Sequence, residues 1–327
     1  MKAINWGVLA TGTIARKFAG TLAQLPDCGN VIAVASRNGE TAAQFASEYH
    51  IDRAYGSYIE LACDPDVDAV YVATPHSAHY ETAKLCLENG KSVLCEKTFT
   101  TNAAQANELF ALAEAKKLFI MEAFWTKFLP AYAQVKQVIA DGVIGDITHF
   151  RAQYGFAPTG ARYIRKFDPS LAGGALLDIG VYTIGVAAMI LGYNPLKIHS
   201  SCIIGEYGTD RLDSIMLEYE KGVTAHLVAT IGSVMDQHAI VYGTQGHIIL
   251  PEFSALQYFQ VELKDGTRYA RRTPFEVNGF EFQIREVEKC LKSEQTESRI
   301  MTHQNTVDVI GLMDRMRLDW GLVFPCG

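Results

Sequence analysis

The N-terminal part of the sequence alternates short apolar runs with longer segments of helical periodicity. The apolar runs cover residues 4–9, 31–35, 69–73, 92–95 and 119–121, and the helical segments cover 14–25, 40–48, 78–88 and 103–117. Strands that are apolar throughout and separated by helices of ten or more residues indicate a parallel sheet buried on both faces. Residues 1–123 therefore predict a doubly wound α/β domain of the Rossmann type.

The pattern changes after residue 123. We expect a helix at 131–140, a strand at 147–155, a Gly/Pro/Arg-rich loop to Pro169 and an apolar helix at 174–191. Short, often alternating runs joined by Gly-containing turns follow at 198–204, 213–220, 223–231, 238–242, 247–250 and 257–263, and two helices follow at 281–291 and 303–320. Residues 124–327 therefore predict an α+β domain with a large, mostly antiparallel open sheet.

Charge and composition weigh against several classes of protein. The net charge is −7, the pI is near 5.7, and no basic run suggests nucleic-acid binding. No apolar stretch approaches the roughly 18 residues of a membrane helix, and the N-terminus lacks the apolar region of a signal peptide. We expect a cytoplasmic protein without a membrane partner.

Cysteine and histidine spacing gives no sign of a metal site. The seven cysteines are scattered without a CxxC pair, and the nine histidines form no helical ligand pair. We expect reduced, mostly buried thiols and no bound metal.

The first strand is followed by a close match to the dinucleotide fingerprint GxGxxG/A, in residues 10–15. Backbone N–H groups at the start of the next helix would bind a pyrophosphate, and Gly12 would permit close approach. Ala10 replaces the first glycine, so we expect this residue to keep a negative φ. The alternative is an ordinary tight turn between strand and helix.

The second strand ends at Ser36-Arg37, where an NAD-selective site usually places a carboxylate. A hydroxyl followed by a guanidinium suits the 2′-phosphate of NADP, because arginine makes charge-assisted, bidentate bonds to phosphate. NADP is therefore the preferred cofactor, with NAD possible. The alternative is a solvated arginine at a strand end.

Polar residues also follow the next two buried strands. Thr74-Pro75-His76 and His79 follow one strand, and Glu96-Lys97 ends the other. Ligands of open α/β sheets bind outside the carboxyl ends of strands. Near a cationic nicotinamide the pKa of a lysine falls towards neutrality, so Lys97 could transfer a proton. The alternative for Lys97 is an ion pair with Glu96 or another carboxylate.

Asp178 and Tyr182 open the apolar helix of the second domain. They are four residues apart and so share one helical face, which lets a carboxylate and a phenol address the same pocket. The alternatives are a helix-dipole role for Asp178 and a packed aromatic role for Tyr182.

Together these motifs resemble the Gfo/Idh/MocA oxidoreductase family over nearly the whole chain. The motifs are the fingerprint, Thr74-Pro75-His76 with His79, Glu96-Lys97-Thr98, Met121-Glu122-Ala123-Phe124-Trp125 and the segment 173–182. Tyr182, where histidine is common in the family, and the segments 54–58 and 93–97 are similar to the branch of dihydrodiol dehydrogenases and NADP-dependent xylose dehydrogenases.

The resemblance implies a role for each matching residue. Lys97 is the catalytic lysine, with Asp178 and Tyr182 as its partners; Thr98 replaces the usual proline. Trp125 borders nicotinamide and substrate, and Arg165 is a loop arginine near the sugar site. Lys97 and Tyr182 would exchange the hydroxyl proton, while Asp178 and His79 orient the substrate or relay the proton. The cofactor-binding set comprises Ala10, Thr11, Gly12, Thr13, Ile14, Ser36, Arg37, Thr74, Pro75, His76, His79, Glu96, Lys97 and Trp125, and the substrate-binding set comprises Lys97, Trp125, Arg165, Asp178 and Tyr182.

The expected activity is hydride transfer between NADP or NAD and a secondary alcohol or carbonyl of a sugar, a sugar derivative or a cyclic vicinal diol. Two alternatives stay open: a dinucleotide-binding regulator without turnover, and an oxidoreductase that retains its cofactor and cycles it between two sugars. A sheet open on one face needs covering, so we expect a homodimer or homotetramer.

Overall fold

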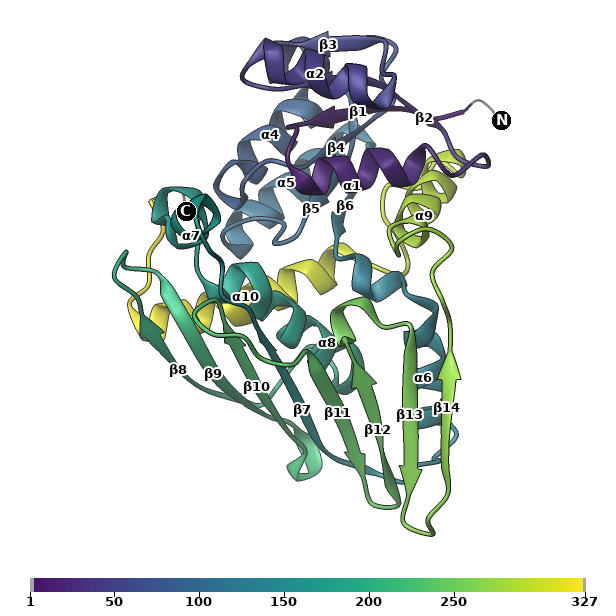
Figure 1. The fold of residues 1–327 in the computed structure, drawn as a ribbon, viewed down its shortest axis with the longest axis vertical. Coiled ribbons are helices and arrows are strands. Elements are labelled where there is room, and N and C mark those ends of the chain that lie inside the picture. Colours follow the sequence, from purple (N-terminus) through teal and green to yellow (C-terminus); the bar gives the residue numbers. More distant parts are fainter. Residues whose placement is uncertain (1–2, 326–327) are drawn as a thin grey trace. The chain divides into compact units, whose positions relative to one another are not determined.

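The parallel sheet predicted for the N-terminal residues is present in the computed structural model, which describes residues 3–325 apart from the side chains of 161–163. Six parallel strands lie in the order β3-β2-β1-β4-β5-β6 (Figure 1). Their bounds are β1 Asn5–Leu9, β2 Asn30–Ala35, β3 Arg53–Tyr55, β4 Ala69–Val72, β5 Ser92–Glu96 and β6 Ile120–Ala123. The order reverses between β1 and β4, and a doubly wound sheet binds its ligand at such a reversal.

Helices connect these strands as predicted, with two additional short elements. The connecting helices are α1 Thr13–Leu22, α2 Gly39–Tyr49, α3 Tyr58–Ala62, α4 His76–Glu88 and α5 Ala103–Lys116. The sequence reading missed β3 and α3, which have three and five residues and are too short to show a periodicity. The core packs Trp6 and Phe18 edge to face and stacks Phe18 on Tyr71, with 4.0 Å between the latter two ring centroids.

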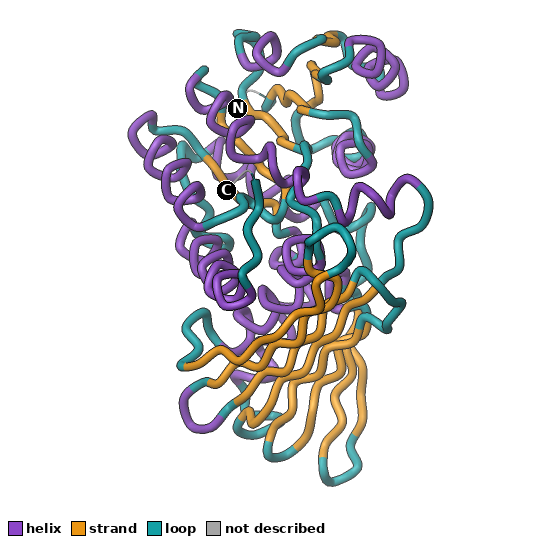
Figure 2. Tube along the Cα trace, turned by 90° about the vertical axis from the view of Figure 1, so that its left-hand side faces the viewer, coloured by secondary structure: helices purple, strands orange, loops and turns teal. Residues whose placement is uncertain are grey.

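The second sheet has eight strands in the order β14-β13-β12-β11-β7-β10-β9-β8. Figure 2 shows these strands as one broad, twisted sheet. Their bounds are β7 Ile147–Gly155, β8 Lys197–Ile204, β9 Asp210–Glu218, β10 Thr224–Thr230, β11 His238–Gly243, β12 Gly246–Pro251, β13 Tyr258–Leu263 and β14 Arg268–Arg272. Neighbours are antiparallel except β7 and β10, which confirms the predicted mostly antiparallel sheet.

Helices α6 Pro130–Ala140 and α8 Val181–Leu191 pack against this sheet. The remaining helical elements are α7 Ala161–Phe167, α9 Glu281–Lys292, α10 His303–Trp320, the π-helical turn Leu176–Gly180, and 3₁₀ turns at Trp125–Phe128, Pro169–Leu171, Glu220–Gly222 and Phe253–Ala255. The sequence reading expected one α-helix over 174–191, whereas the structure begins it with the π-helical turn.

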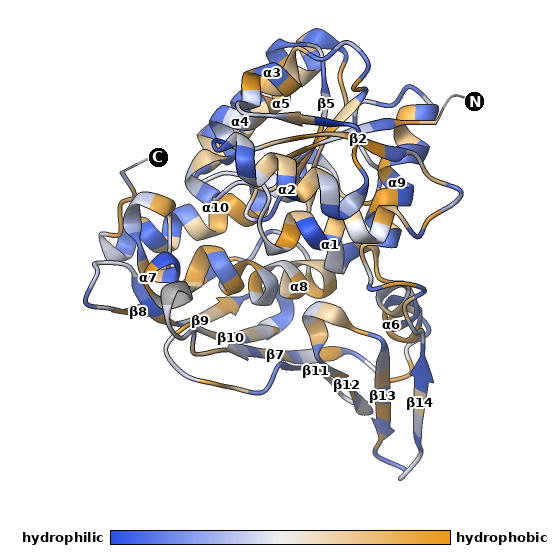
Figure 3. Cartoon of the chain, turned by 45° about the horizontal axis from the view of Figure 1, so that its top comes forward, coloured by the Kyte–Doolittle hydropathy of each residue, from blue (hydrophilic) through white to orange (hydrophobic). Residues whose placement is uncertain are grey.

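Strand β14 was not predicted, because its arginine-rich sequence lacks the alternation of a half-buried strand. Figure 3 shows it as a hydrophilic edge strand. Charged side chains on an edge oppose uncontrolled pairing with another strand.

The chain crosses between its compact units more often than the predicted boundary at 123/124 allows. One unit comprises Met1–Trp125 and Glu276–Val307, and the other comprises Thr126–Phe275 and Asp308–Gly327. Helix α9 belongs to the first unit because its Glu288 accepts hydrogen bonds from Trp6 Nε1 and Gly29 N, at 3.1 and 2.6 Å. These contacts join residues more than 250 positions apart, which local sequence patterns do not reveal.

One helical stretch, Pro169–Leu191, is long and apolar enough to cross a membrane by length and composition, with a mean hydropathy of 1.9. This differs from the expectation that no such stretch exists. Because 89% of its most apolar 18-residue window is buried inside the protein, the stretch has the character of a core helix.

Among the cysteines, Cys86, Cys95 and Cys290 are buried, Cys28 and Cys202 are half-buried, and Cys63 is exposed. All six are free thiols, and Cys326 lies outside the described residues.

Candidate active site

The polar segments predicted from the sequence lie at one edge of the parallel sheet. Strands β2, β1, β4 and β5 are successive neighbours, and the carboxyl ends of parallel strands share an edge (Figure 1). The residues that follow these strands include Arg37, Gly12, Pro75 and Lys97. This edge contains the topological reversal at which a dinucleotide would bind.

The fingerprint turn differs from its prediction at Ala10. Its φ is +77°, so the expectation of a negative φ is wrong. Residue 10 accepts the left-handed strain that a glycine would avoid, a cost of roughly 1–2 kcal/mol, and its N–H bonds to the Ala35 carbonyl at 2.9 Å.

Gly12 is the N-cap of α1, and its side-chain position faces open space. Its φ of −73° is available to any residue, and no side chain caps the helix. Apart from its own chain neighbours, a Cβ built at Gly12 would have no protein atom within 4 Å. Neither backbone conformation nor packing therefore requires glycine here. The space and the α1 N–H groups fit a pyrophosphate, which a side chain would displace.

The end of β2 has a structured turn and an exposed guanidinium. The Ser36 and Thr41 hydroxyl oxygens lie 2.8 Å apart, and the Asn38 side chain caps α2 by accepting from two backbone N–H groups. Arg37 is exposed. Burial raises the pKa of Tyr58, and the nearby Arg37 charge opposes that shift. Arg37 is therefore available to an anionic group at this corner.

His79 is buried, and both of its ring nitrogens face carbonyl oxygens. Nδ1 lies 2.8 Å from the Thr98 carbonyl and Nε2 lies 2.8 Å from the Thr74 carbonyl. Burial lowers the pKa of His79, and the two carbonyls oppose that shift. This geometry differs from the expected relay or cofactor contact, because His79 ties the end of β4 to the Lys97 segment instead.

Lys97 directly follows β5 and is half-buried, and its peptide bond to Thr98 is cis. Its neighbour Glu96 points into the unit and accepts a hydrogen bond from the Tyr71 hydroxyl. Burial raises the pKa of Glu96, while Tyr71 and Lys97 oppose the shift. The structure thus makes Glu96 a buried support beside Lys97.

Trp125 lies in a cluster that the sequence reading missed. The Lys17 ammonium is 4.1 Å from the Trp125 ring centroid and 4.0 Å from that of Phe280. Burial lowers the pKa of Lys17 to about 8, although Glu96 and Glu281 oppose the shift. A cation over both rings fixes the indole orientation. Nothing in the α1 pattern distinguished Lys17 from a solvated helix lysine.

In the second unit, Asp178 forms an ion pair with Lys166. The Lys166 ammonium lies 2.5 Å from Asp178 Oδ1, and Asp178 is buried. Arg165 is exposed, and its role near the substrate stays a prediction. The ion pair of Lys166 with Asp178 was not predicted, because the sequence does not determine the direction of each side chain.

Tyr182 lies one turn after Asp178 and is buried. Its ring centroid is 5.9 Å from that of Tyr154 on β7. Asp178 belongs to the π-helical turn and Tyr182 to the first turn of α8. Such π-helical turns occur frequently at functional sites.

The matches with known proteins cover both parts of the chain. Residues 4–124 match the family model described as oxidoreductase family, NAD-binding Rossmann fold, and 132–249 match the GFO/IDH/MocA C-terminal domain. The chain is 35% identical to trans-1,2-dihydrobenzene-1,2-diol dehydrogenase of Xenopus laevis, over 99% of this chain and 100% of the relative. The human protein of the same name is 33% identical, with 99% of this chain and 98% of the relative covered.

Solved structures are also similar to this chain over nearly its whole length. A 3-ketoreductase from Actinomadura kijaniata in complex with NADP and TDP-benzene is 28% identical, with a TM-score of 0.87 and coverage of 97% of this chain and 98% of that chain. Solved variants of that protein have a tyrosine replaced by phenylalanine or a lysine replaced by alanine. An aldose-aldose oxidoreductase from Caulobacter crescentus, 21% identical with a TM-score of 0.87 over 97% of each chain, shares the fold.

Proposed function

Because the chain belongs to the Gfo/Idh/MocA oxidoreductase family, we propose that it is an NADP-preferring dehydrogenase or reductase of a sugar, a sugar derivative or a cyclic vicinal diol. It would act on a secondary alcohol or the corresponding carbonyl. One observation carries the proposal. Lys97 follows β5, and the turn with open space at Gly12 follows β1, so both lie at the same edge of the parallel sheet.

The first unit has the groups that a dinucleotide requires. The α1 N-terminus at Gly12 would receive the pyrophosphate, and Arg37 would bind the 2′-phosphate of NADP. Thr74, Pro75, His76 and Trp125 would border the rest of the cofactor. When bound, the nicotinamide accepts or donates the hydride.

The chain itself would move the proton. Lys97 and Tyr182 would exchange the proton of the substrate hydroxyl. Glu96 would support Lys97 from the buried side, and His79 would hold the backbone on which Lys97 lies. Asp178, oriented by Lys166, would accept a hydrogen bond from the substrate.

The relatives support this substrate class. Those at 33–35% identity are named diol dehydrogenases, and the 28% identical structure is named a 3-ketoreductase and contains NADP. Both names describe interconversion of a carbinol and a carbonyl, which is the reaction proposed here.

We also infer a cytoplasmic homodimer or homotetramer. Residues on β8 alternate between half-buried and exposed, and Ile203 is 57% exposed. A second copy covering this face would remove that apolar surface from water. Sedimentation analysis tests the oligomeric state, and a monomer at micromolar concentration would contradict the inferred oligomer.

Kinetics with matched variants test the catalytic roles. Lys97→Ala and Tyr182→Phe should lower kcat strongly while NADP affinity, measured by fluorescence titration, stays within about twofold. General acid–base groups contribute roughly 10²–10⁴-fold to rate. Unchanged kcat in both variants would refute the proton-transfer roles, and NADP binding without any turnover would favour a regulator.

A further inference from the structure

Asp210, at the start of β9, holds the turn that precedes Asp178. It is fully buried, and its Oδ2 accepts a hydrogen bond from Leu176 N at 2.5 Å. Gly174 has a φ of +127°, and a Cβ there would overlap the Asp210 carboxylate. This close approach requires glycine at residue 174. Asp210 thereby determines where the π-helical turn begins.

The same strand end holds the segment that carries Lys166. The Thr209 hydroxyl donates to the Phe167 carbonyl at 3.0 Å, and Gly174 N donates to the Lys166 carbonyl at 2.8 Å. Both partners of the Lys166–Asp178 ion pair therefore depend on the position of residues 209 and 210.

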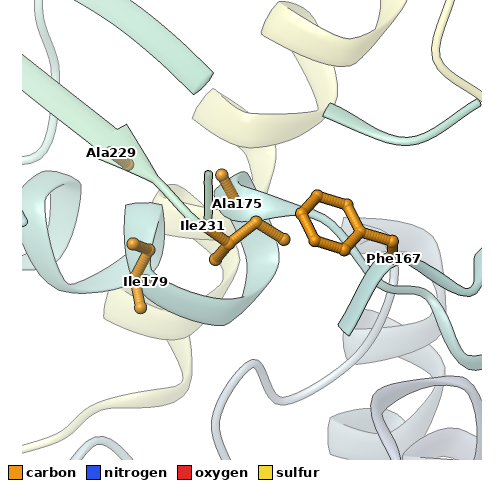
Figure 4. Close-up of a cluster of buried hydrophobic side chains, with 5 residues drawn as sticks. All are labelled: Phe167, Ala175, Ile179, Ala229 and Ile231. Carbon is orange, nitrogen blue, oxygen red and sulfur yellow. The ribbon is translucent and has the colours of Figure 1, made fainter. Parts of the chain in front are cut away.

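Asp213 lies on the same strand and is also fully buried. Among the described residues, neither of its side-chain oxygens has a hydrogen-bond partner, and nor does Asp210 Oδ1, when both groups are treated as carboxylates. Ala229 is the residue opposite Asp213 on β10. Ala229 belongs to an apolar cluster with Phe167, Ala175, Ile179 and Ile231 (Figure 4). An unpaired charge in such surroundings is strongly unfavourable.

Among the described side chains that face the two aspartates, none supplies a compensating charge to Asp213. On β8, Cys202 lies opposite Asp213, and burial together with both carboxylates raises the pKa of this thiol to about 11. In the π-helical turn, Asp178 is paired with Lys166, and Arg211 on β9 is exposed. The remaining strand β10 presents Ala229.

The two carboxyl groups differ in what stabilises their charge. Burial raises the pKa of Asp210, but the N–H groups of Leu176 and Ala175 favour its anion. Burial, the Asp210 charge and a side-chain hydrogen bond between the two carboxyl groups raise the pKa of Asp213 well above its usual range. Two neighbouring carboxyl groups that hold one proton between them satisfy an oxygen of each, since one donates to the other.

We propose that Asp213 is a protonated carboxylic acid in the folded protein, that it donates a hydrogen bond to Asp210, and that this pair positions the turn that presents Asp178. Asp210 and Asp213 are positioning residues in this scheme. The effect of the pair on catalysis rests on the proposed function, whereas the presence of a proton on Asp213 does not depend on it.

The proton makes stability depend on pH in a defined direction. An unfolded aspartate loses its proton near pH 3.9, whereas the folded protein keeps it on Asp213. The folded state then binds more protons than the unfolded state, so stability falls as pH rises above about 4. This single group should weaken the folding equilibrium tenfold for each pH unit until the pair loses its proton.

Asp213→Asn tests the proton directly, because an amide N–H can donate to Asp210 without titrating. Urea unfolding of the full chain at pH 4.5, 5 and 5.5 should show the folding constant of Asp213→Asn rising with pH relative to wild type, by up to about tenfold per pH unit. Parallel pH dependences would overturn the proposal, as would failure of Asp213→Asn to fold, since the amide preserves the hydrogen bond.

Asp213→Leu, which has no donor, tests the positioning role. With folding verified by circular dichroism, its kcat/KM should fall at least tenfold, whereas Asp213→Asn should stay within about twofold of wild type. Equal kcat/KM in Asp213→Leu and wild type would refute the positioning role. A protein without turnover on any substrate would refute the proposed function alone, and the stability measurement would still decide the proton.

Discussion

Replacing Gly12 by alanine should separate cofactor binding from folding. The glycine has a φ of −73° and a ψ of −178°, and, apart from its own chain neighbours, an added Cβ meets no protein atom within 4 Å. The free energy of unfolding should therefore fall by no more than about 1 kcal/mol, because alanine is a poorer N-cap than glycine but introduces neither strain nor a clash.

The same methyl group would occupy the space in front of the α1 N–H groups. Each hydrogen bond from an N–H to a charged phosphate contributes roughly 1.5–3 kcal/mol, so loss of one weakens NADP about 10–150-fold. Fluorescence titration with NADP measures the affinity, and urea unfolding measures the stability.

Gly20→Ala is the matched control in the same helix. A Cβ at Gly20 would meet Tyr49 at 3.6 Å, an ordinary contact. This variant should gain roughly 0.5–1 kcal/mol of stability from helix propensity and bind NADP as wild type does. Unchanged NADP affinity in Gly12→Ala, or equal weakening in both variants, would refute the assignment of the pyrophosphate to this turn.

Three further outcomes are expected. Arg37→Ala should weaken NADP about 10–100-fold through loss of a charge-assisted bond and leave NAD nearly unchanged; equal loss for both cofactors would argue against a 2′-phosphate contact. The pKa of Lys17 is about 8 in the folded protein, against an ordinary value of 10.5. The stability of wild type relative to Lys17→Met should therefore rise with pH between these two values. Urea unfolding at pH 7 and pH 10 measures this, and an equal stability difference between the two proteins at both pH values would show that Lys17 is solvated. A double-mutant cycle of Lys166→Met and Asp178→Asn should give a coupling of about 1–2 kcal/mol, since Asp178 is buried while Lys166 is 35% exposed; additive losses would exclude a stabilising pair.

The fold was predictable where patterns are local. Apolar strands and amphipathic helices of ordinary length indicated the Rossmann unit, and alternating short runs indicated the antiparallel sheet. The return of α9 to the first unit was not predictable, because it depends on hydrogen bonds between Glu288 and residues near the N-terminus.

The candidate site was predictable as a set of strand ends but not in its side-chain directions. The order β2-β1-β4-β5 brings the predicted segments to one edge. The sequence could not show that Lys166 pairs with Asp178, or that His79 faces two carbonyls. Nor could it show that Ala10 adopts a left-handed conformation, because the surrounding strand and helix impose it.

Nicotinamide absorbance tests the central claim most directly. Wild type and Lys97→Ala would be compared with NADP and with NAD on a panel of aldoses, anhydro sugars, inositols and cyclic diols. We expect NADP-dependent turnover of at least one sugar or diol by wild type, at least about 10²-fold slower turnover by Lys97→Ala, and NADP binding by both proteins. Equal turnover by the two proteins would contradict the role of Lys97.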